Sequence, residues 1–470
     1  MAKKTINKEL TGAQDLYNFL FEACNIIRGP VSQDNFKDYI TPLLYYKRIS
    51  DVYDEETEEA LISSGGDKEY ASLPEQHRFV IPDGCHWQEV RERTENLGAA
   101  IVGAMRQIEI ANPDTLYGVL SMFSSQKWTN KAILNDSKIR DLIEHLSKRK
   151  LGNKDYPADL MGDAYEILLK KFADDSKAQA GEFYTPRSVV RLLVHILDPQ
   201  PGETVYDPAC GSGGMLIEAI RYMHDDSLCC GSIFGQEKNV VNAAIAKMNL
   251  FLHGASDFNV MQGDTLRDPK ILQGGNIAKF DCVIANPPFS LENWGATEWS
   301  SDKYKRNIYG TPSDSCGDYA WIQHMICSMS SGKGRMAVVM PQGILFRGNQ
   351  EAEIRKQLVE SDLIEAVVTL GDKLFYGTGL SPCFLIIRRM KQAHHSGRIL
   401  MIDGSKILTQ KRAQNILEEN DIDRLYSLYQ NYSDEEDYSR IVTLQEIRDK
   451  EYNLSPNRYV VYHKEEIRPY

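Results

Sequence analysis

Thr204-Val205-Tyr206-Asp207-Pro208-Ala209-Cys210-Gly211-Ser212-Gly213-Gly214 is the stretch that decides the fold. Its first three residues are β-branched or aromatic and predict a short strand, and the helix-like run from Met215 to Met223 predicts a helix. A strand, a glycine loop and a helix form the first unit of a doubly wound α/β sheet. The loop lacks the G-x-G-x-x-G pattern of dinucleotide sites, and Asp207 at its mouth favours a ligand that carries an ammonium group.

Two more acidic residues follow predicted strands. Glu237 ends the strand 232–236, where a carboxylate suits the hydroxyls of a ribose, and Asp264 ends the strand 258–263, where it can accept a hydrogen bond from an adenine amino group. Each acid alone is more often a solvated loop carboxylate. Because ligands of open α/β sheets bind at the carboxyl ends of strands, the ordered series predicts one binding site.

Asn286-Pro287-Pro288-Phe289 follows the apolar strand 280–285. The two prolines end the strand and fix the turn. The Asn286 amide oxygen and the Pro287 carbonyl can accept both protons of an exocyclic amine, and Phe289 can stack on a flat base such as adenine. An ordinary strand-ending turn is the alternative, because Asn and Pro are common in turns.

These segments together resemble the ordered motifs of adenine-N6 DNA methyltransferases, and more closely the modification (M) subunit of type I restriction–modification systems. The resemblance covers nearly the whole chain, because the segments 38–51, 317–325 and 335–343 are also similar to that family. It implies a Rossmann-like, S-adenosylmethionine-dependent methyltransferase sheet and methylation of adenine in double-stranded DNA. It also implies a specificity (S) subunit that chooses the target, a second M subunit and a restriction (R) subunit as partners.

The expected site residues fall into three groups. The target adenine is expected at Asn286, Pro287, Pro288 and Phe289. The cofactor is expected at Glu182, Phe183, Tyr184, Thr185, Pro186, Arg187, Asp207, Gly211, Ser212, Gly213, Gly214, Glu237 and Asp264. Backbone phosphates are expected at Lys303, Lys305 and Arg306, because a loop beside a flipped base meets phosphates. For 181–187 an ordinary helix start is the alternative, since Thr185 and Pro186 are typical of a first turn.

Three regions are predicted along the chain. Residues 1–156 form a helical N-terminal domain, with helices at 12–28, 33–57 and 87–107. Residues 157–405 form the methyltransferase domain, with later strands at 336–340, 364–370 and 383–388, the last two antiparallel. Residues 406–470 form a helical region that contacts the specificity subunit, and their deletion is expected to break that contact while sparing cofactor binding.

Composition agrees with this interpretation. The net charge of −12 predicts weak DNA binding by the chain alone, and the basic run 148–150 is interpreted as a solvated face. No apolar run is long enough to span a membrane, and the start of the chain has no secretory signal. The nine cysteines contain no C-x-x-C pair, so we expect a cytoplasmic protein with neither disulfides nor a metal site.

Three other functions stay open from the residues alone. A non-catalytic assembly subunit is disfavoured by two features. They are the intact turn Asn286-Pro287-Pro288-Phe289, called the NPPF turn below, and the series of acids Asp207, Glu237 and Asp264. A nicotinamide-dependent enzyme is disfavoured by the missing fingerprint and by Asp207. A stand-alone adenine methyltransferase requires its own target-recognition domain, and the chain after Arg389 contains no segment long enough to form one.

Overall fold

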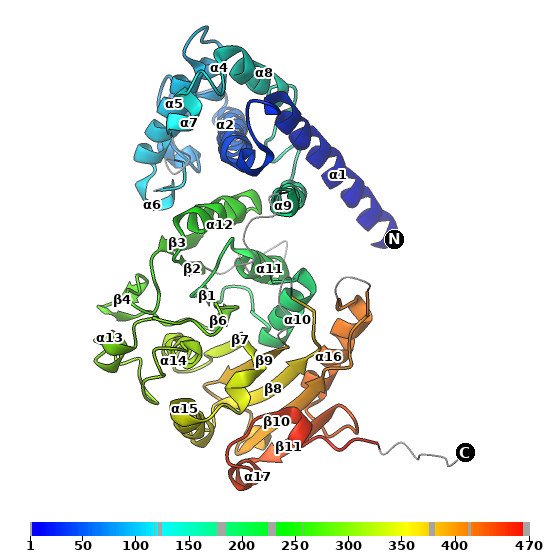
Figure 1. The fold of residues 1–470 in the computed structure, drawn as a ribbon. Coiled ribbons are helices and arrows are strands. Elements are labelled where there is room, and N and C mark those ends of the chain that lie inside the picture. Colours follow the sequence, from blue (N-terminus) through cyan, green and yellow to red (C-terminus); the bar gives the residue numbers. More distant parts are fainter. Residues whose placement is uncertain are drawn as a thin grey trace. The chain divides into compact units, whose positions relative to one another are not determined.

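The computed structural model describes residues 2–116, 118–120, 125–175, 185–223, 232–255, 257–375, 381–411 and 415–463 (Figure 1). The chain divides into two compact units. The first contains Met1–Gln179 and Lys247–Ala255, and the second contains Ala180–Ala246 and Ser256–Tyr470. The sequence predicted a third, C-terminal region, but its residues belong to the second unit.

The first unit is helical, as predicted. Its helices are α1 (Ala2–Ile27), α2 (Lys37–Ser63), α3 (Lys68–Ala71), α4 (Trp87–Arg91), α5 (Leu97–Ala111), α6 (Pro113–Leu116), α7 (Ser125–Thr129), α8 (Asp136–Leu146) and α9 (Ala158–Asp175), together with the end of α12 (Val240–Leu252). The single helix predicted over 87–107 is wrong, because the chain breaks between α4 and α5. Asn96 there adopts a left-handed backbone with φ 54°, and the Asp136 carboxylate accepts hydrogen bonds from the Asn96 and Leu97 amides.

Helix α2 forms the centre of this unit. It is buried continuously from Tyr39 to Val52, and a helix that is buried on all sides must satisfy its charged groups internally. Lys47 pairs with Asp51, and Arg48 donates to the carbonyls of Leu151 and Tyr156. The segment 38–51, which carried part of the family resemblance, therefore ties α2 to the chain just before α9.

The second unit is built on a nine-stranded sheet with the order β11-β10-β8-β9-β7-β6-β1-β2-β3. The strands are β1 (Val205–Asp207), β2 (Ile233–Glu237), β3 (Phe258–Gln262), β6 (Cys282–Ala285), β7 (Arg335–Pro341), β8 (Ile364–Leu370), β9 (Pro382–Arg388), β10 (Arg398–Gly404) and β11 (Ser439–Thr443). A separate hairpin pairs β4 (Leu272–Gln273) with β5 (Asn276–Ile277). The seven strands predicted from the sequence are all present, and β8 and β9 are antiparallel, as predicted.

Helices cover both faces of this sheet. The helices are α10 (Arg187–Leu197), α11 (Gly214–Met223), α13 (Ala296–Ser300), α14 (Asp318–Ser328), α15 (Asn349–Glu360), α16 (Glu419–Asn431) and α17 (Leu444–Asp449). Figure 1 shows α10 and α16 on one side of the sheet and α14 and α15 on the other. One apolar core runs under the α14 and α15 side and includes Tyr206, Val283, Met336, Val367 and Met401.

The region after Lys406 is part of this sheet. β11 pairs antiparallel with β10, and α16 packs on α10, where Arg191 forms an ion pair with Glu419. The sequence predicted a helical region here, and the structure adds the unpredicted strand β11 to the helices α16 and α17. Deletion of this region would strip an edge strand from β10 and uncover α10, so the expectation that cofactor binding survives this deletion is withdrawn.

No helix in the described ranges has both the length and the apolar character needed to cross a lipid bilayer.

Candidate active site

Four of the predicted site residues lie at one edge of the sheet. Strands β6, β1, β2 and β3 are consecutive neighbours and run parallel, so their carboxyl ends lie side by side. Asp207 and Glu237 are the last residues of β1 and β2, Asn286 follows β6 directly, and Asp264 follows shortly after β3. The order of strands reverses at β1, which is where ligands bind in open α/β sheets.

Two glycines shape the backbone of the loop after β1. Gly211 and Gly213 have φ of 53° and 86°, a left-handed conformation that residues with a side chain rarely adopt. The Gly213 amide donates to the Cys210 carbonyl at 2.8 Å, which closes the turn before α11. A β-carbon built at Gly211 or Gly214 would meet nothing within 4 Å. The loop is therefore open on that side, and a ligand can approach its backbone.

Glu237 connects the second strand to this loop. One carboxylate oxygen accepts from the Gly211 amide at 3.0 Å, and the other accepts from the Asn239 amide at 2.7 Å. The side chain is half-buried. Two backbone donors thus orient this carboxylate at the carboxyl end of β2, beside the open face of the glycine loop.

Asp207 is a buried carboxyl group. It is 2% exposed, and its Oδ1 accepts from the Ala209 amide at 2.9 Å. Burial raises the pKa of Asp207 to about 8, and the neighbouring Glu237 charge adds to this rise. Among the residues that the structure describes, Asp207 forms no ion pair. A cation next to it would stabilise its charged form.

Asp264 has partners on both oxygens. Its Oδ1 accepts from the Leu266 and Arg267 amides, each at 3.2 Å, and its Oδ2 pairs with Lys238 at 2.9 Å. The neighbouring Thr265 hydroxyl donates to the Pro208 carbonyl at 2.6 Å. The turn after β3 is thus fastened to the turn after β1, and Asp264 lies at the predicted edge with a clear local structural role.

Asn286 presents an acceptor without a partner. Its Nδ2 donates to the Thr185 hydroxyl at 2.7 Å, which leaves Oδ1 available as an acceptor. This oxygen is buried, and no hydrogen-bond donor reaches it from the described part of the chain. Such an orphaned acceptor is costly in a folded protein and needs an explanation. Pro287 is buried and Phe289 is half-buried on the same turn.

The segment before α10 is described only from Thr185 onward. Glu182, Phe183 and Tyr184 lie outside the described residues. Pro186 occupies the N-cap of α10, one position before the helix, and Arg187 is exposed with its Nε 3.9 Å from the Glu218 carboxylate. Thr185 is the member of this predicted group that the structure connects to Asn286.

One predicted DNA contact is wrong. Arg306 is only 2% exposed, pairs with Asp302 at 2.8 Å, and donates to the carbonyls of Thr265 and Leu266. Its guanidinium braces the turn after β3 from inside and cannot face a phosphate. Lys303 and Lys305, in the same run, are exposed.

Sequence reasoning missed the support of the NPPF turn. The Ser290 amide donates to Asp318 Oδ1 at 2.7 Å, and Asp318 pairs in turn with Arg347. The segment that begins at Gly317 carried a family resemblance, yet nothing in its pattern indicates which loop Asp318 reaches. A charged residue inside an otherwise apolar helix start was the available signal.

Cys316, Asp318 and Glu351 resemble a metal-binding cluster at first sight. Their possible ligand atoms lie within 4.8 Å of one another. Arg347, however, pairs with both carboxylates and already supplies a positive charge. The cluster is therefore interpreted as part of the scaffold behind the NPPF turn.

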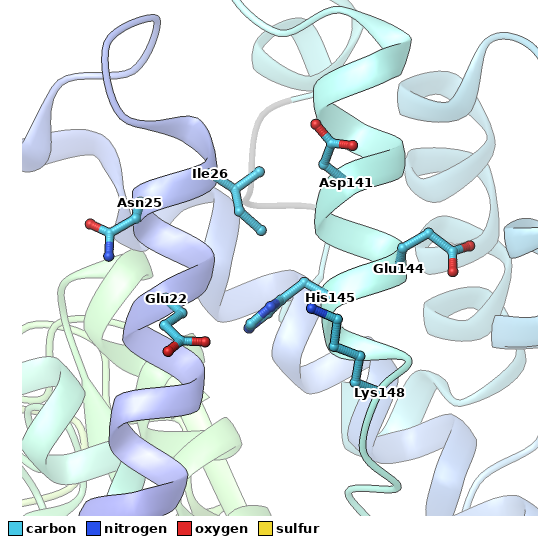
Figure 2. Close-up of a pocket in the computed structure, with 7 residues that line it drawn as sticks. All are labelled: Glu22, Asn25, Ile26, Asp141, Glu144, His145 and Lys148. Carbon is cyan, nitrogen blue, oxygen red and sulfur yellow. The ribbon is translucent and has the colours of Figure 1, made fainter.

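A hollow in the helical unit is separate from these residues. It lies between α1 and α8, has a volume of about 470 Å³, and contains none of the predicted site residues (Figure 2). It is lined by Glu22, Asn25, Ile26, Asp141, Glu144, His145 and Lys148. His145 bonds the Phe19 carbonyl at 2.8 Å and stacks on the Phe19 ring, and Glu144 is held by Arg91. His145 and Glu144 therefore already have structural partners.

Comparison with known proteins agrees with this geometry. The family described as N-6 DNA Methylase matches residues 156–467, and the HsdM N-terminal domain matches residues 16–146. The chain belongs to the N-6 DNA methylase family. It has the domain composition of the methylase subunits of type I restriction enzymes, and its enzymatic class is adenine-specific DNA methyltransferase.

Individual relatives extend over most of the chain. The MjaVII type I restriction enzyme methylase subunit of Methanocaldococcus jannaschii is 35% identical over 90% of this chain and 75% of its own length. The MjaVIII methylase subunit of the same organism is 32% identical over 96% of this chain and 79% of its own length. The solved type I methyltransferase subunit of Streptococcus thermophilus is 26% identical, with a TM-score of 0.80 over 96% of this chain and 100% of that one.

Proposed function

We propose that this chain transfers a methyl group from S-adenosylmethionine to the exocyclic amine of adenine in double-stranded DNA, as the modification subunit of a type I restriction–modification complex. The observation that carries the proposal is the position of Asn286 Oδ1, which follows β6 directly at the carboxyl ends of the parallel strands, next to the strand that leads into the open glycine loop. This buried oxygen has no hydrogen-bond donor among the described residues, so it can accept a hydrogen bond from the amine of a bound base.

The residues along β1 and β2 fit the cofactor. When bound, S-adenosylmethionine supplies an electrophilic methyl group on a sulfonium. Asp207 suits the cofactor's ammonium group, because a nearby cation lowers the free energy of a carboxylate that burial otherwise disfavours. Glu237, oriented by two backbone amides, suits the ribose hydroxyls, and Gly211 to Gly214 admit the ligand to the backbone. Thr185 and Pro186 precede α10, where helix N–H groups suit a carboxylate.

Asn286 and Pro287 act on the target. The adenine amine is a poor nucleophile because its lone pair is delocalised into the ring. Hydrogen bonds from the two amine protons to Asn286 Oδ1 and the Pro287 carbonyl localise that lone pair. The Thr185 hydroxyl, bonded to Nδ2, holds the amide with its oxygen toward the amine. Fixed placement of two reactants supplies about 7–11 kcal/mol of the rate acceleration.

Phe289 offsets part of the cost of exposing the base. The target leaves the DNA stack at a cost of a few kcal/mol. Stacking on an aromatic side chain returns about 1–3 kcal/mol per base. Lys303 and Lys305 remain candidates for backbone phosphates, because they are exposed in the run that follows the NPPF turn.

The proposed function also requires partner subunits. The net charge of −12 opposes strong DNA binding by the chain alone, so the specificity subunit is proposed to supply target choice and most of the affinity. A second modification subunit and a restriction subunit are proposed to join it. Support comes from relatives that are named as methylase subunits of type I restriction enzymes.

The experiment is to express the chain with and without its neighbouring specificity gene and to map N6-methyladenine in the host DNA. We expect methylation at one defined sequence only when both are present. Asn286→Ala should abolish it while labelled S-adenosylmethionine still binds with unchanged affinity. Sequence-specific methylation by the chain alone would refute the subunit assignment, and full activity of Asn286→Ala would refute the proposed chemistry.

A further inference from the structure

The NPPF turn ends in a backbone conformation that needs external support. Ser290, the residue after Phe289, has φ of 50°, in the left-handed region that a serine adopts only at a cost. Asn293, three residues later, has φ of 53°. Asparagine adopts this region readily, so the costly conformation is that of Ser290, and the groups that contact the loop at Ser290 must hold it in place.

Two hydrogen bonds hold this loop against the start of α14. The Ser290 amide donates to Asp318 Oδ1 at 2.7 Å, and the Gly317 amide donates to the Leu291 carbonyl at 3.0 Å. Asp318 is fully buried, with 0% exposure. A hydrogen bond to a buried carboxylate is stronger than one between neutral groups, so this contact dominates the pair.

Asp318 is itself held by a buried charge network. Arg347 donates to Asp318 Oδ2, and its Nε donates to Glu351 Oε2 at 2.6 Å. The Arg347 carbonyl accepts from Arg355 at 2.8 Å, and Arg355 is 3% exposed. Both oxygens of Asp318 therefore have partners, and the partner of Oδ2, Arg347, is held in turn by residues of α15.

We propose that Asp318 is a positioning residue for methyl transfer: through the Ser290 amide it sets the place of the turn that carries Asn286 and Phe289, and Arg347 holds its carboxylate in orientation. The inference rests on the proposed role of Asn286. Asp318 contacts the loop backbone on the Ser290 side, whereas the glycine loop and Glu237 belong to other strands. Its effect is therefore on the rate of transfer and on the capture of the flipped base, and not on cofactor affinity.

The test compares two buried carboxylates that share Arg347. Asp318→Ala removes the contact to the turn, whereas Glu351→Ala removes the other partner of Arg347 and leaves Ser290 bonded. In the assembled methyltransferase, we expect Asp318→Ala to lower kcat on the order of 10²-fold, the penalty of a displacement near 1 Å. The KM for DNA and the affinity for S-adenosylmethionine should stay within about twofold. Glu351→Ala should keep kcat within about threefold although both variants lose thermal stability.

Two more variants separate positioning from general damage. Asp318→Asn keeps an oxygen for the Ser290 amide and should recover at least about tenfold of the lost kcat. Ser290→Gly keeps the donor, tolerates the positive φ, and should retain the wild-type rate. Fluorescence of 2-aminopurine at the target position should show less of the extruded base in Asp318→Ala.

The possible outcomes separate the positioning role of Asp318 from the proposed function of the chain. If Asp318→Ala and Glu351→Ala lower kcat equally, or if Asp318→Ala loses cofactor affinity in parallel with kcat, the positioning role is refuted while the proposed function stands. An Asn286→Ala control that retains activity would refute the proposed function instead.

Discussion

Asp207 and Asp318 are both buried aspartates, and they support neighbouring loops of one sheet edge, after β1 and after β6. Asp318 has a backbone donor on one oxygen and Arg347 on the other. Asp207 has one backbone donor and, within the described residues, no cation, so burial raises its pKa to about 8. The difference teaches how to interpret a buried carboxyl group. One with partners on both oxygens indicates a structural role, whereas one that lacks a partner indicates the place of a ligand.

The largest effect expected from this comparison is on folding stability. Asp318→Ala leaves the Ser290 amide without an acceptor and leaves Arg347 paired with Glu351 alone. Removing one partner of a buried ion pair costs about 3–5 kcal/mol. Denaturant unfolding of the second unit should show this loss, and Asp207→Ala should show a much smaller one. Equal losses at the two positions would mean that both aspartates belong to the scaffold.

A smaller effect is expected on the ligand side of the comparison. Glu237→Ala removes two charge-assisted acceptors beside the glycine loop and should weaken S-adenosylmethionine binding by about 1.5–3 kcal/mol. Titration calorimetry measures this directly. Glu298→Ala, an exposed acid on α13, is the control and should bind normally. Unchanged affinity of Glu237→Ala would leave Glu237 with only its loop contacts.

The raised pKa of Asp207 predicts an unusual dependence of stability on pH. Its folded value of about 8 lies above the ordinary 3.8, so the folded chain binds a proton that the unfolded chain releases. The stability from this group is complete below about pH 4 and is lost as pH rises to about 8. Asp207→Asn should remove this decline and exceed the wild type by about 1–3 kcal/mol at pH 9.

Cofactor binding provides a second test of the raised pKa of Asp207. A bound ammonium group would lower the pKa of Asp207, so binding at pH 7 should release up to one proton. Calorimetry in two buffers of different ionisation enthalpy measures this release, and Asp207→Asn should show none. Absence of proton release in the wild type would remove Asp207 from the ammonium site.

The smallest effect concerns the exposed lysines near the turn. Lys303→Ala with Lys305→Ala should lower the slope of log affinity for DNA against log salt by about 2, in line with roughly 0.9 for each lost phosphate contact. The measurement requires the assembled complex. Arg306→Ala should instead destabilise the fold, because its guanidinium is buried against Asp302 and two carbonyls. A salt effect for Arg306 without a stability loss would contradict its buried role.

The sheet edge was predictable because its strands are short apolar runs that end in polar residues, as at Asp207, Glu237 and Asn286. Parallel order then brings those ends together whatever the intervening helices contain. Strand β10 was not predicted, although its run from Ile399 to Ile402 is apolar. The run lies directly before the predicted end of the methyltransferase domain at residue 405, and it was treated as part of that boundary. Strand β11 mixes charged and apolar residues and has no strong pattern of its own.

The burial of charged side chains could not be predicted from the sequence. Arg306 lies close to two lysines in the chain, and only the fold reveals that it donates to two backbone carbonyls of the turn after β3. The same holds for Asp318, whose partner Ser290 is distant in sequence and has a backbone conformation that no side-chain pattern signals. Long-range satisfaction of polar groups depends on topology and not on local propensity.

The order of strands also has a consequence for how the chain matures during synthesis. β1 emerges from the ribosome well before its neighbour β6, and β9 is made after β8 but is inserted between β8 and β7. Pairings between segments so distant in sequence form slowly, since the intervening loops must close first. The strand that precedes Asn286 thus pairs with β1 across a long intervening segment, and the nine-stranded sheet is complete only when β11 has been translated. The pairing that places Asn286 beside the glycine loop is therefore expected to be among the slower steps of folding.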